Sequence, residues 1–343
     1  MVMRGWRRLG GLIGGVAAAG GQPSLFIHAG LHKTGTTALQ ESLARHRETL
    51  AGRGILYPLA GCPGEAPGQH NLAWQVTRDR RFHSAYGTVD DVAEEIAAHG
   101  GDAVISSEDF ESVLDRPDLL DRLARHPRLK GYQVVLVIYL REQSSYFKSL
   151  FFQLTRDGLT EEVDRLADIV CETGSLRLRE WTFLFDYGRA VARLSRWKNG
   201  KFILRNYHSL AGGSSVSDFL GVVCPGLVLP QDEAAGRVNE ERDLSAALLD
   251  FYEGRLPLAL TDGQKSLLAE CRARLGGGGG QLSLATKRRL AERFKASNRM
   301  LKCFGGAHMT FPVPPEGEGA GPTLEQLFSF EMQCRLMGSD PGR

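Results

Sequence analysis

The sequence has 343 residues, of which 42% are hydrophobic and 24% charged, and its net charge is +2 at pH 7. This length suffices for one large α/β domain with a buried core, or for two small domains. The ordinary composition excludes collagen-like, disordered and multi-span membrane proteins. The near-neutral charge favours neither a nucleic-acid binder nor a membrane-surface protein, so any anion site must be local.

The N-terminal residues 1–23 precede the first convincing structural element. Arg4, Arg7 and Arg8 are followed by a short apolar stretch that is interrupted by glycine and is too short to span a bilayer. The segment is compatible with a disordered leader, a weak signal peptide or a start codon assigned too far upstream.

Short apolar runs alternate with amphipathic segments along most of the chain. Strands are predicted at 24–29, 103–106, 134–140 and 201–206, and helices at 36–50, 89–99, 115–129 and 142–156, with a loop at 60–70. The run at 134–140 is the most apolar and does not alternate, which indicates a central strand covered on both faces. The alternation predicts a three-layer α/β fold with a central parallel sheet flanked by helices. We expect one domain over 24–310 and an irregular tail over 311–343.

The six cysteines are scattered and none forms a C-x-x-C pair or lies at zinc-ligand spacing from histidines. They indicate reduced thiols in a cytoplasmic protein. No metal motif is present in the sequence.

A glycine-containing turn links the first predicted strand to the first predicted helix, where backbone N–H groups and a helix N-terminus can hold an anion. Gly30 and Gly35 have the spacing of a P-loop, but Thr36 occupies the position after the second glycine, where that motif has lysine. The lysine, Lys33, lies earlier in the turn. A nucleotide kinase or NTPase is therefore the weaker interpretation. Lys33 could reach a bridging oxygen, while Thr36 and Thr37 could donate to a 5′-phosphate.

The stretch from His28 to Gln40, HAGLHKTGTTALQ, resembles the 5′-phosphosulfate loop of sulfotransferases that use 3′-phosphoadenosine 5′-phosphosulfate (PAPS), particularly a bacterial branch of that family. The resemblance implies a P-loop-related sulfotransferase fold in which Lys33 stabilises the leaving phosphate. The donor-binding residues that it implies in this loop are Gly30, His32, Lys33, Thr34, Gly35, Thr36 and Thr37.

A second motif follows the apolar strand 134–140. Arg141 stands at its carboxyl end, where ligands bind in open α/β sheets, and Ser149 follows eight residues later in the next helix. This arrangement resembles the family's 3′-phosphate site, which distinguishes PAPS from ordinary nucleotides. With looser matches elsewhere, the resemblance covers about residues 24–305.

Two residues are candidates for the base that takes the acceptor's proton. Glu108 follows the strand 103–106 and occupies a place comparable to the catalytic His or Glu of several sulfotransferase branches. His70, in the stretch after the 60–70 loop, titrates near neutrality and is the second candidate. His28 and His32 are expected to be structural or to lie beside the donor.

The resemblance thus implies an enzyme that transfers a sulfuryl group from PAPS to a hydroxyl or amine and releases 3′,5′-adenosine bisphosphate (PAP). We expect a saccharide, glycolipid or small-metabolite acceptor, bound by residues 60–88, with Arg78, Arg80 and Arg81, and by 156–185. We expect no metal requirement, no nucleic-acid partner and no membrane span; the sequence does not predict the oligomeric state. The competing interpretations are a P-loop kinase or NTPase and a PAP-binding module that has lost its chemistry.

Overall fold

The computed structural model describes residues 21–159, 161–229, 251, 261–276, 280–306, 308–313, 323–329 and 332. The predicted leader therefore lies almost wholly outside the described residues, as does most of the predicted tail. The chain divides into two compact units, which are described separately. The first comprises Met1–Arg141, Arg177–Gln231 and Ala296–Phe311, and the second comprises Glu142–Leu176, Asp232–Lys295 and Pro312–Arg343.

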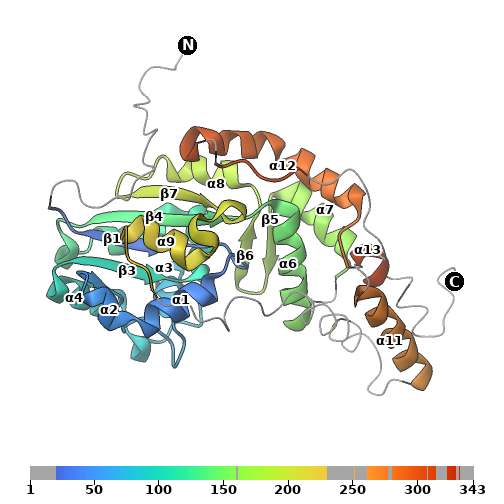
Figure 1. Ribbon diagram of the computed structural model, residues 1–343, viewed down its shortest axis with the longest axis horizontal. Helices are drawn as coiled ribbons and strands as arrows, with labels where there is room; N and C mark the ends of the chain where they lie inside the picture. Colours follow the sequence, from blue (N-terminus) through green and yellow to red (C-terminus); the bar gives the residue numbers. More distant parts are fainter. Residues whose placement is uncertain are drawn as a thin grey trace, which may run out of the picture. The chain divides into compact units, whose positions relative to one another are not determined.

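A five-stranded sheet forms the centre of the first unit (Figure 1). Its strands, in spatial order, are β2 (Ile55–Leu56), β3 (Asp102–Ser106), β1 (Ser24–His28), β4 (Gln133–Leu140) and β7 (Lys201–Asn206). Every pairing is parallel, with Ile27 opposite Ile105 on one side and Leu136 on the other. The carboxyl ends of β1, β3 and β4 consequently meet at one edge, where ligands bind in such sheets.

Helices flank this sheet, and those with bounds in the first unit are α1 (Thr36–Arg45), α2 (Arg47–Ala51), α3 (His70–Thr77), α4 (Val89–His99), α5 (Asp121–Ala124), α8 (Tyr187–Leu194) and α9 (Ser215–Val223). The predicted three-layer α/β fold, of the P-loop type, is therefore confirmed. A separate two-stranded sheet joins β5 (Ser175–Leu178) to β6 (Trp181–Leu184).

The core on one face of the sheet lies under α1 and α9, which pack together in front of the strands in Figure 1. Phe26 of β1 and Val137 of β4 point to this face and meet Leu39, Leu43 and Phe219 from the two helices. The alternate residues of the strands are equally buried. This double burial explains why the strands read as continuous apolar runs.

The second unit contains α6 (Gln143–Arg156), α7 (Val163–Thr173), α11 (Asp262–Gly276) and α13 (Leu324–Leu327), while α12 (Leu284–Gly305) runs through both units. Three phenylalanines pack edge to face within it. The ring of Phe328 lies 4.9 Å from that of Phe151 and 5.0 Å from that of Phe251. Such pairs stabilise beyond the burial of their area.

Local sequence signals account for where the helices begin and end. Thr88 and Asp91 form a capping box at the start of α4, and Gly100 ends the helix in the left-handed conformation, as the prediction for 89–99 requires. The helix predicted over 36–50 is interrupted at His46, which separates α1 from α2.

The prediction of one helix over 115–129 is wrong. This segment consists of the 3₁₀ helix Pro117–Leu120, the short α5 and the 3₁₀ helix Pro127–Leu129. His126, which precedes a proline, has ψ 132°, an extended conformation that cannot continue a helix. Pro127 therefore divides the apolar pattern into short turns.

The helices of the described residues include none that is long and apolar enough to cross a membrane.

A buried ion pair joins β4, β7 and α9. The carboxylate of Asp218 accepts hydrogen bonds from the guanidinium of Arg205 and, at 2.8 Å, from the hydroxyl of Tyr139. Its side chain is fully buried, whereas that of Arg205 is 25% exposed. Three elements therefore depend on one carboxylate.

We expect Asp218→Asn to lower the free energy of unfolding by about 3 kcal/mol, because it leaves the largely buried Arg205 without a counter-charge. Denaturant unfolding at neutral pH measures this loss. The matched control is Glu94→Gln, which removes a carboxylate 4.0 Å from Arg128 in an exposed pair and should change stability little. Equal effects of the two substitutions would contradict the assignment.

Candidate active site

The turn between β1 and α1 is tightly folded. Gly35 has φ 77°, and its carbonyl accepts a hydrogen bond of 3.1 Å from the Ser215 hydroxyl. A Cβ at Gly35 would lie 2.8 Å from that hydroxyl oxygen, so the position requires glycine. A Cβ at Gly30 would lie 2.9 Å from His28 Nε2 and 2.9 Å from Thr36 Cγ2. Both glycines are thus needed for the close packing of the turn.

Lys33 occupies the left-handed region with φ 64°, although it has a Cβ. Such a conformation costs about 1 kcal/mol or more and is maintained by the surrounding structure. The side chain of Lys33 is half-buried, Thr36 is buried and Thr37 is exposed at the start of α1. The Thr34 hydroxyl donates a hydrogen bond of 2.6 Å to the Leu31 carbonyl inside the turn.

Arg141, at the end of β4, reaches this turn. Its Nη1 donates a hydrogen bond of 2.8 Å to the carbonyl of Lys33, and its guanidinium carbon lies 5.2 Å from the centre of the Tyr207 ring. The Tyr187 hydroxyl donates to the carbonyl of Arg141 at 2.8 Å. The two sequence motifs therefore meet at one residue of the turn. Ser149 lies half-buried on α6 in the second unit, so its joint use of a phosphate with Arg141 stays a prediction.

Both candidate bases lie at the end of β3. His70 Nδ1 is 2.9 Å from the Ser107 hydroxyl, 3.8 Å from Glu108 Oε2 and 3.6 Å from Asp109 Oδ2. Gln40 of α1 donates a hydrogen bond of 2.8 Å to the Glu108 carboxylate. The structure thus brings Glu108 and His70 together, and Gln40 links them to α1, the helix that follows the turn after β1.

Burial and nearby charges set the protonation of these groups. Burial disfavours the charged form of His70, but the carboxylates of Asp109 and Glu108 outweigh this effect and raise its pKa. Burial also opposes ionisation of Asp109, yet His70, His32 and Arg81 lower its pKa to about 2. Burial lowers the pKa of His32, and it lowers that of His28 to about 3. His28 is thus neutral, and its Nδ1 lies 2.7 Å from the Ser106 hydroxyl.

Glu111 is a buried carboxylate that accepts hydrogen bonds from two backbone N–H groups. One oxygen accepts from the N–H of His32 at 3.2 Å and the other from the N–H of Leu184 at 2.6 Å. It lies on the 3₁₀ helix Glu108–Leu114, directly after β3. The turn between β1 and α1 is therefore connected to β6 through this side chain.

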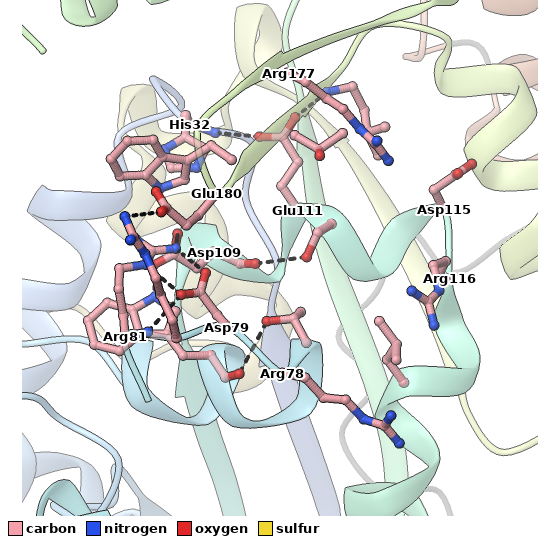
Figure 2. Close-up of a pocket in the computed structure, with 18 residues that line it drawn as sticks. His32, Arg78, Asp79, Arg81, Asp109, Glu111, Asp115, Arg116, Arg177 and Glu180 are labelled. Atoms are coloured by element: carbon pink, nitrogen blue, oxygen red, sulfur yellow. Dashed lines mark hydrogen bonds and ion pairs between the residues drawn. The ribbon is translucent and has the colours of Figure 1, made fainter. Parts of the chain in front are cut away.

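A cavity of about 450 Å³ opens beside His32 (Figure 2). It is lined by Trp74, Arg78, Arg80 and Arg81 from α3 and the residues after it, and by Arg177, Glu180 and Trp181 from the β5–β6 hairpin. The two segments that the sequence analysis expected to shape the acceptor pocket both contribute. The guanidinium carbon of Arg81 lies 4.8 Å from the Trp74 ring and 5.0 Å from the Trp181 ring.

Several residues of this region had no role in the sequence analysis. Glu111 and Trp181 carry no motif signal, because their importance comes from contacts with residues that are distant in the sequence. Gln40 belongs to the stretch His28–Gln40, but its contact with Glu108 spans 68 residues. Asp109 likewise had no role in the sequence analysis, and its carboxylate accepts a hydrogen bond of 2.8 Å from the Trp74 indole.

The described part of the chain contains no group of three or more His, Cys, Asp or Glu side chains that could hold a metal ion.

Comparisons with known proteins identify no family for this chain. No protein-family model matches the sequence, and no curated protein matches it. Among solved structures, one chain from the PezAT chromosomal toxin–antitoxin system of Streptococcus pneumoniae is 12% identical, with a TM-score of 0.30. The match covers 68% of this chain and 88% of that chain. A similarity of this degree gives no information on function.

The strained backbone at Lys33 can be tested with two substitutions that both remove the side chain. We expect Lys33→Gly to be more stable to denaturant than Lys33→Ala by about 1 kcal/mol, because only glycine adopts φ 64° without cost. Equal free energies of unfolding would show that the left-handed conformation is not strained. Gly100→Ala, at φ 73° in a helix cap outside the site, provides a reference for the size of the effect.

The raised pKa of His70 should depend on Asp109. In Asp109→Asn the burial of His70 remains while the closest charge is lost, so its pKa should fall. In the wild type, the stability that comes from the charged pair is fully present below pH 6.5 and is lost as pH rises through the pKa of His70. In Asp109→Asn this loss should disappear. NMR titration of the imidazole Cε1–H signal measures the shift. Asp118→Asn makes the same charge change at an exposed position, and an equal shift there would refute a local origin.

Proposed function

We propose that this protein is a PAPS-dependent sulfotransferase, in agreement with the resemblance of the stretch His28–Gln40. The observation that carries the proposal is the hydrogen bond between Arg141 Nη1 and the carbonyl of Lys33, which joins the two sequence motifs at one turn. A chance likeness of either motif would not require the two to meet. The shared position at the carboxyl edge of a parallel sheet supports the same conclusion.

The donor would be held by the turn from Gly30 to Thr37. Its backbone amides and the N-terminus of α1 suit the 5′-phosphosulfate, and the Thr36 and Thr37 hydroxyls add donors. We assign Lys33 to neutralising the phosphate that leaves. Arg141 would contact the 3′-phosphate, with Ser149 as its proposed partner, and would thereby select PAPS over nucleotides that lack this group.

In the proposed reaction the acceptor oxygen forms a bond to sulfur while the bond from sulfur to the 5′-phosphate oxygen breaks. PAP keeps the electron pair of the broken bond, and the proton of the acceptor goes to the protein. We assign this proton to Glu108, because the raised pKa of His70 leaves less of its ring in the basic form. His70, 3.8 Å from Glu108, would stabilise the carboxylate before transfer.

The cavity beside His32 is the proposed acceptor site, and its size is in the range of small-molecule pockets. A saccharide, a glycolipid head group or a small metabolite would fit this proposal. We also propose a cytoplasmic location. Among the described side chains, Cys62, Cys171, Cys224 and Cys303 are free thiols, as expected in a reducing compartment.

Calorimetric binding of PAP, ADP and Mg-ATP to the wild type and to Arg141→Ala tests the donor site. We expect PAP to bind at least about tenfold more tightly than ADP, and this preference to disappear in Arg141→Ala, because the substitution removes the charged donor to the 3′-phosphate. The control is Arg53→Ala, an exposed arginine outside the site. Preference for Mg-ATP would indicate a kinase or NTPase and would overturn the proposal.

Turnover with radiolabelled PAPS separates an enzyme from a module that only binds PAP. We expect Lys33→Ala to retain PAP binding within about tenfold and to lose transfer, since the residue acts on the leaving group. Tight PAP binding without transfer to any acceptor in the wild type would favour the inactive module.

A further inference from the structure

The carboxylates that line the cavity are already engaged. Arg81 binds Asp79 through both carboxylate oxygens and lies 3.5 Å from Asp109. Glu180 pairs with Arg80. The remaining two, Asp115 and Glu111, are bound by Arg193 and by backbone N–H groups respectively. Each carboxylate of the lining therefore already has a hydrogen-bond or ion-pair partner within the protein.

Three arginines of the same lining differ from Arg80 and Arg81. Within the described residues, no carboxylate lies within 4.0 Å of the side-chain nitrogens of Arg78, Arg116 or Arg177, and no hydrogen bond engages them. All three are exposed. They come from three different parts of the chain, namely the end of α3, the segment after Glu108–Leu114, and β5.

Figure 2 draws the three guanidinium groups apart from the cluster of Arg81, Asp79 and Asp109 and spaced along the other side of the view, from Arg177 at the top through Arg116 to Arg78 at the bottom. Arg78 ends α3 with φ 59°, so a residue with a long side chain occupies a position that usually favours glycine or asparagine. An anion near these guanidinium groups would be attracted by charge that no carboxylate of the described residues offsets. The lining therefore offers positive charge to a ligand on one side, whereas on the other side Trp74, Trp181 and Arg81 lie beside carboxylates that are already paired.

We propose that the acceptor bound in this cavity carries an anionic group, a carboxylate or a sulfate, that is bound on the side of Arg78, Arg116 and Arg177. This inference rests on the proposed function in calling the ligand an acceptor, whereas the binding of an anion in the cavity does not depend on it. The charged group fixes one end of the acceptor at the arginines. The hydroxyl of the acceptor is then presented toward His32, the residue of the turn that borders the same cavity.

Two probes test this assignment, p-nitrophenyl β-D-glucuronide and p-nitrophenyl β-D-glucoside. They share the sugar ring and the aryl group and differ only in the C6 group, which is a carboxylate in the glucuronide and a hydroxymethyl group in the glucoside. Their binding is followed by calorimetry on the full chain saturated with PAP, so that the donor site is filled. We expect the glucuronide to bind at least about tenfold more tightly than the glucoside, because an arginine of this side adds a charge-assisted hydrogen bond to the carboxylate. Raising the salt concentration should reduce this preference.

The variant Arg78→Asn/Arg116→Gln/Arg177→Gln should bind both probes equally, and asparagine at position 78 preserves the left-handed turn. Arg53→Gln, an exposed arginine elsewhere, should keep the preference. If the triple variant unfolds, the single variant Arg116→Gln should still reduce the preference. The proposal is overturned if the wild type binds the glucoside as tightly, if the glucuronide shows no binding at millimolar concentration, or if the triple variant keeps the preference.

Failure of this inference is distinguishable from failure of the proposed function. Glucuronide binding in a protein that does not bind PAP, measured without PAP, would remove the sulfotransferase proposal and leave the anion site. PAP binding and transfer to a neutral acceptor, with no glucuronide preference, would support the sulfotransferase proposal and remove the anion site.

Discussion

The hydrogen bond from Arg141 to the carbonyl of Lys33 is the constraint on which the site depends. The carbonyl belongs to a residue in a left-handed conformation, and the arginine that holds it is itself fixed by the Tyr187 hydroxyl and by the Tyr207 ring. The strain of the turn is thus balanced by contacts from β4 and from the segments after β6 and β7. Contacts of this kind can hold a strained backbone in place without a ligand, and such preorganisation supports the proposed binding of an anion by the turn.

A second constraint is that the charged side chains near the end of β3 pair with one another within the protein. Asp109 is the centre of this pairing, since His70, Trp74 and Arg81 all face its carboxylate. Burial would otherwise raise its pKa, and the surrounding donors instead hold it at about 2. The neighbouring Glu108 accepts a hydrogen bond from the neutral amide of Gln40 and lies 3.8 Å from His70, and no arginine pairs with it among the described residues. Its side chain is 21% exposed, against 10% for Asp109, and this difference supports its proposed role as the proton acceptor.

Much of the sheet was predictable from sequence, because strands buried on both faces consist of uninterrupted apolar residues, as in β1 and β4. The two-residue strand β2 has no such signal, and the short turns around Pro127 resemble a helix until the proline is considered. Lys33, Glu108 and Arg141 lie at one edge because they follow the parallel strands β1, β3 and β4, whereas His70 begins α3 and its place does not follow from strand order. The partners that fix them, such as Gln40 and Tyr187, do not, because no local pattern encodes contacts across tens of residues.

Glu111 shows why such partners matter for chemistry. Burying a carboxylate is costly unless its oxygens are hydrogen-bonded, and here one oxygen takes the His32 amide of the phosphate turn while the other takes the Leu184 amide of β6. The His32 amide is consequently directed at Glu111, and the Leu31 amide of the same turn donates to the carbonyl of Tyr139 in β4. The carboxylate of Glu111 also ties the turn to β6, the strand that carries Trp181. The turn and this wall of the cavity are therefore held together by one buried side chain, and in the proposed reaction that side chain would set the geometry between acceptor and donor without contacting either.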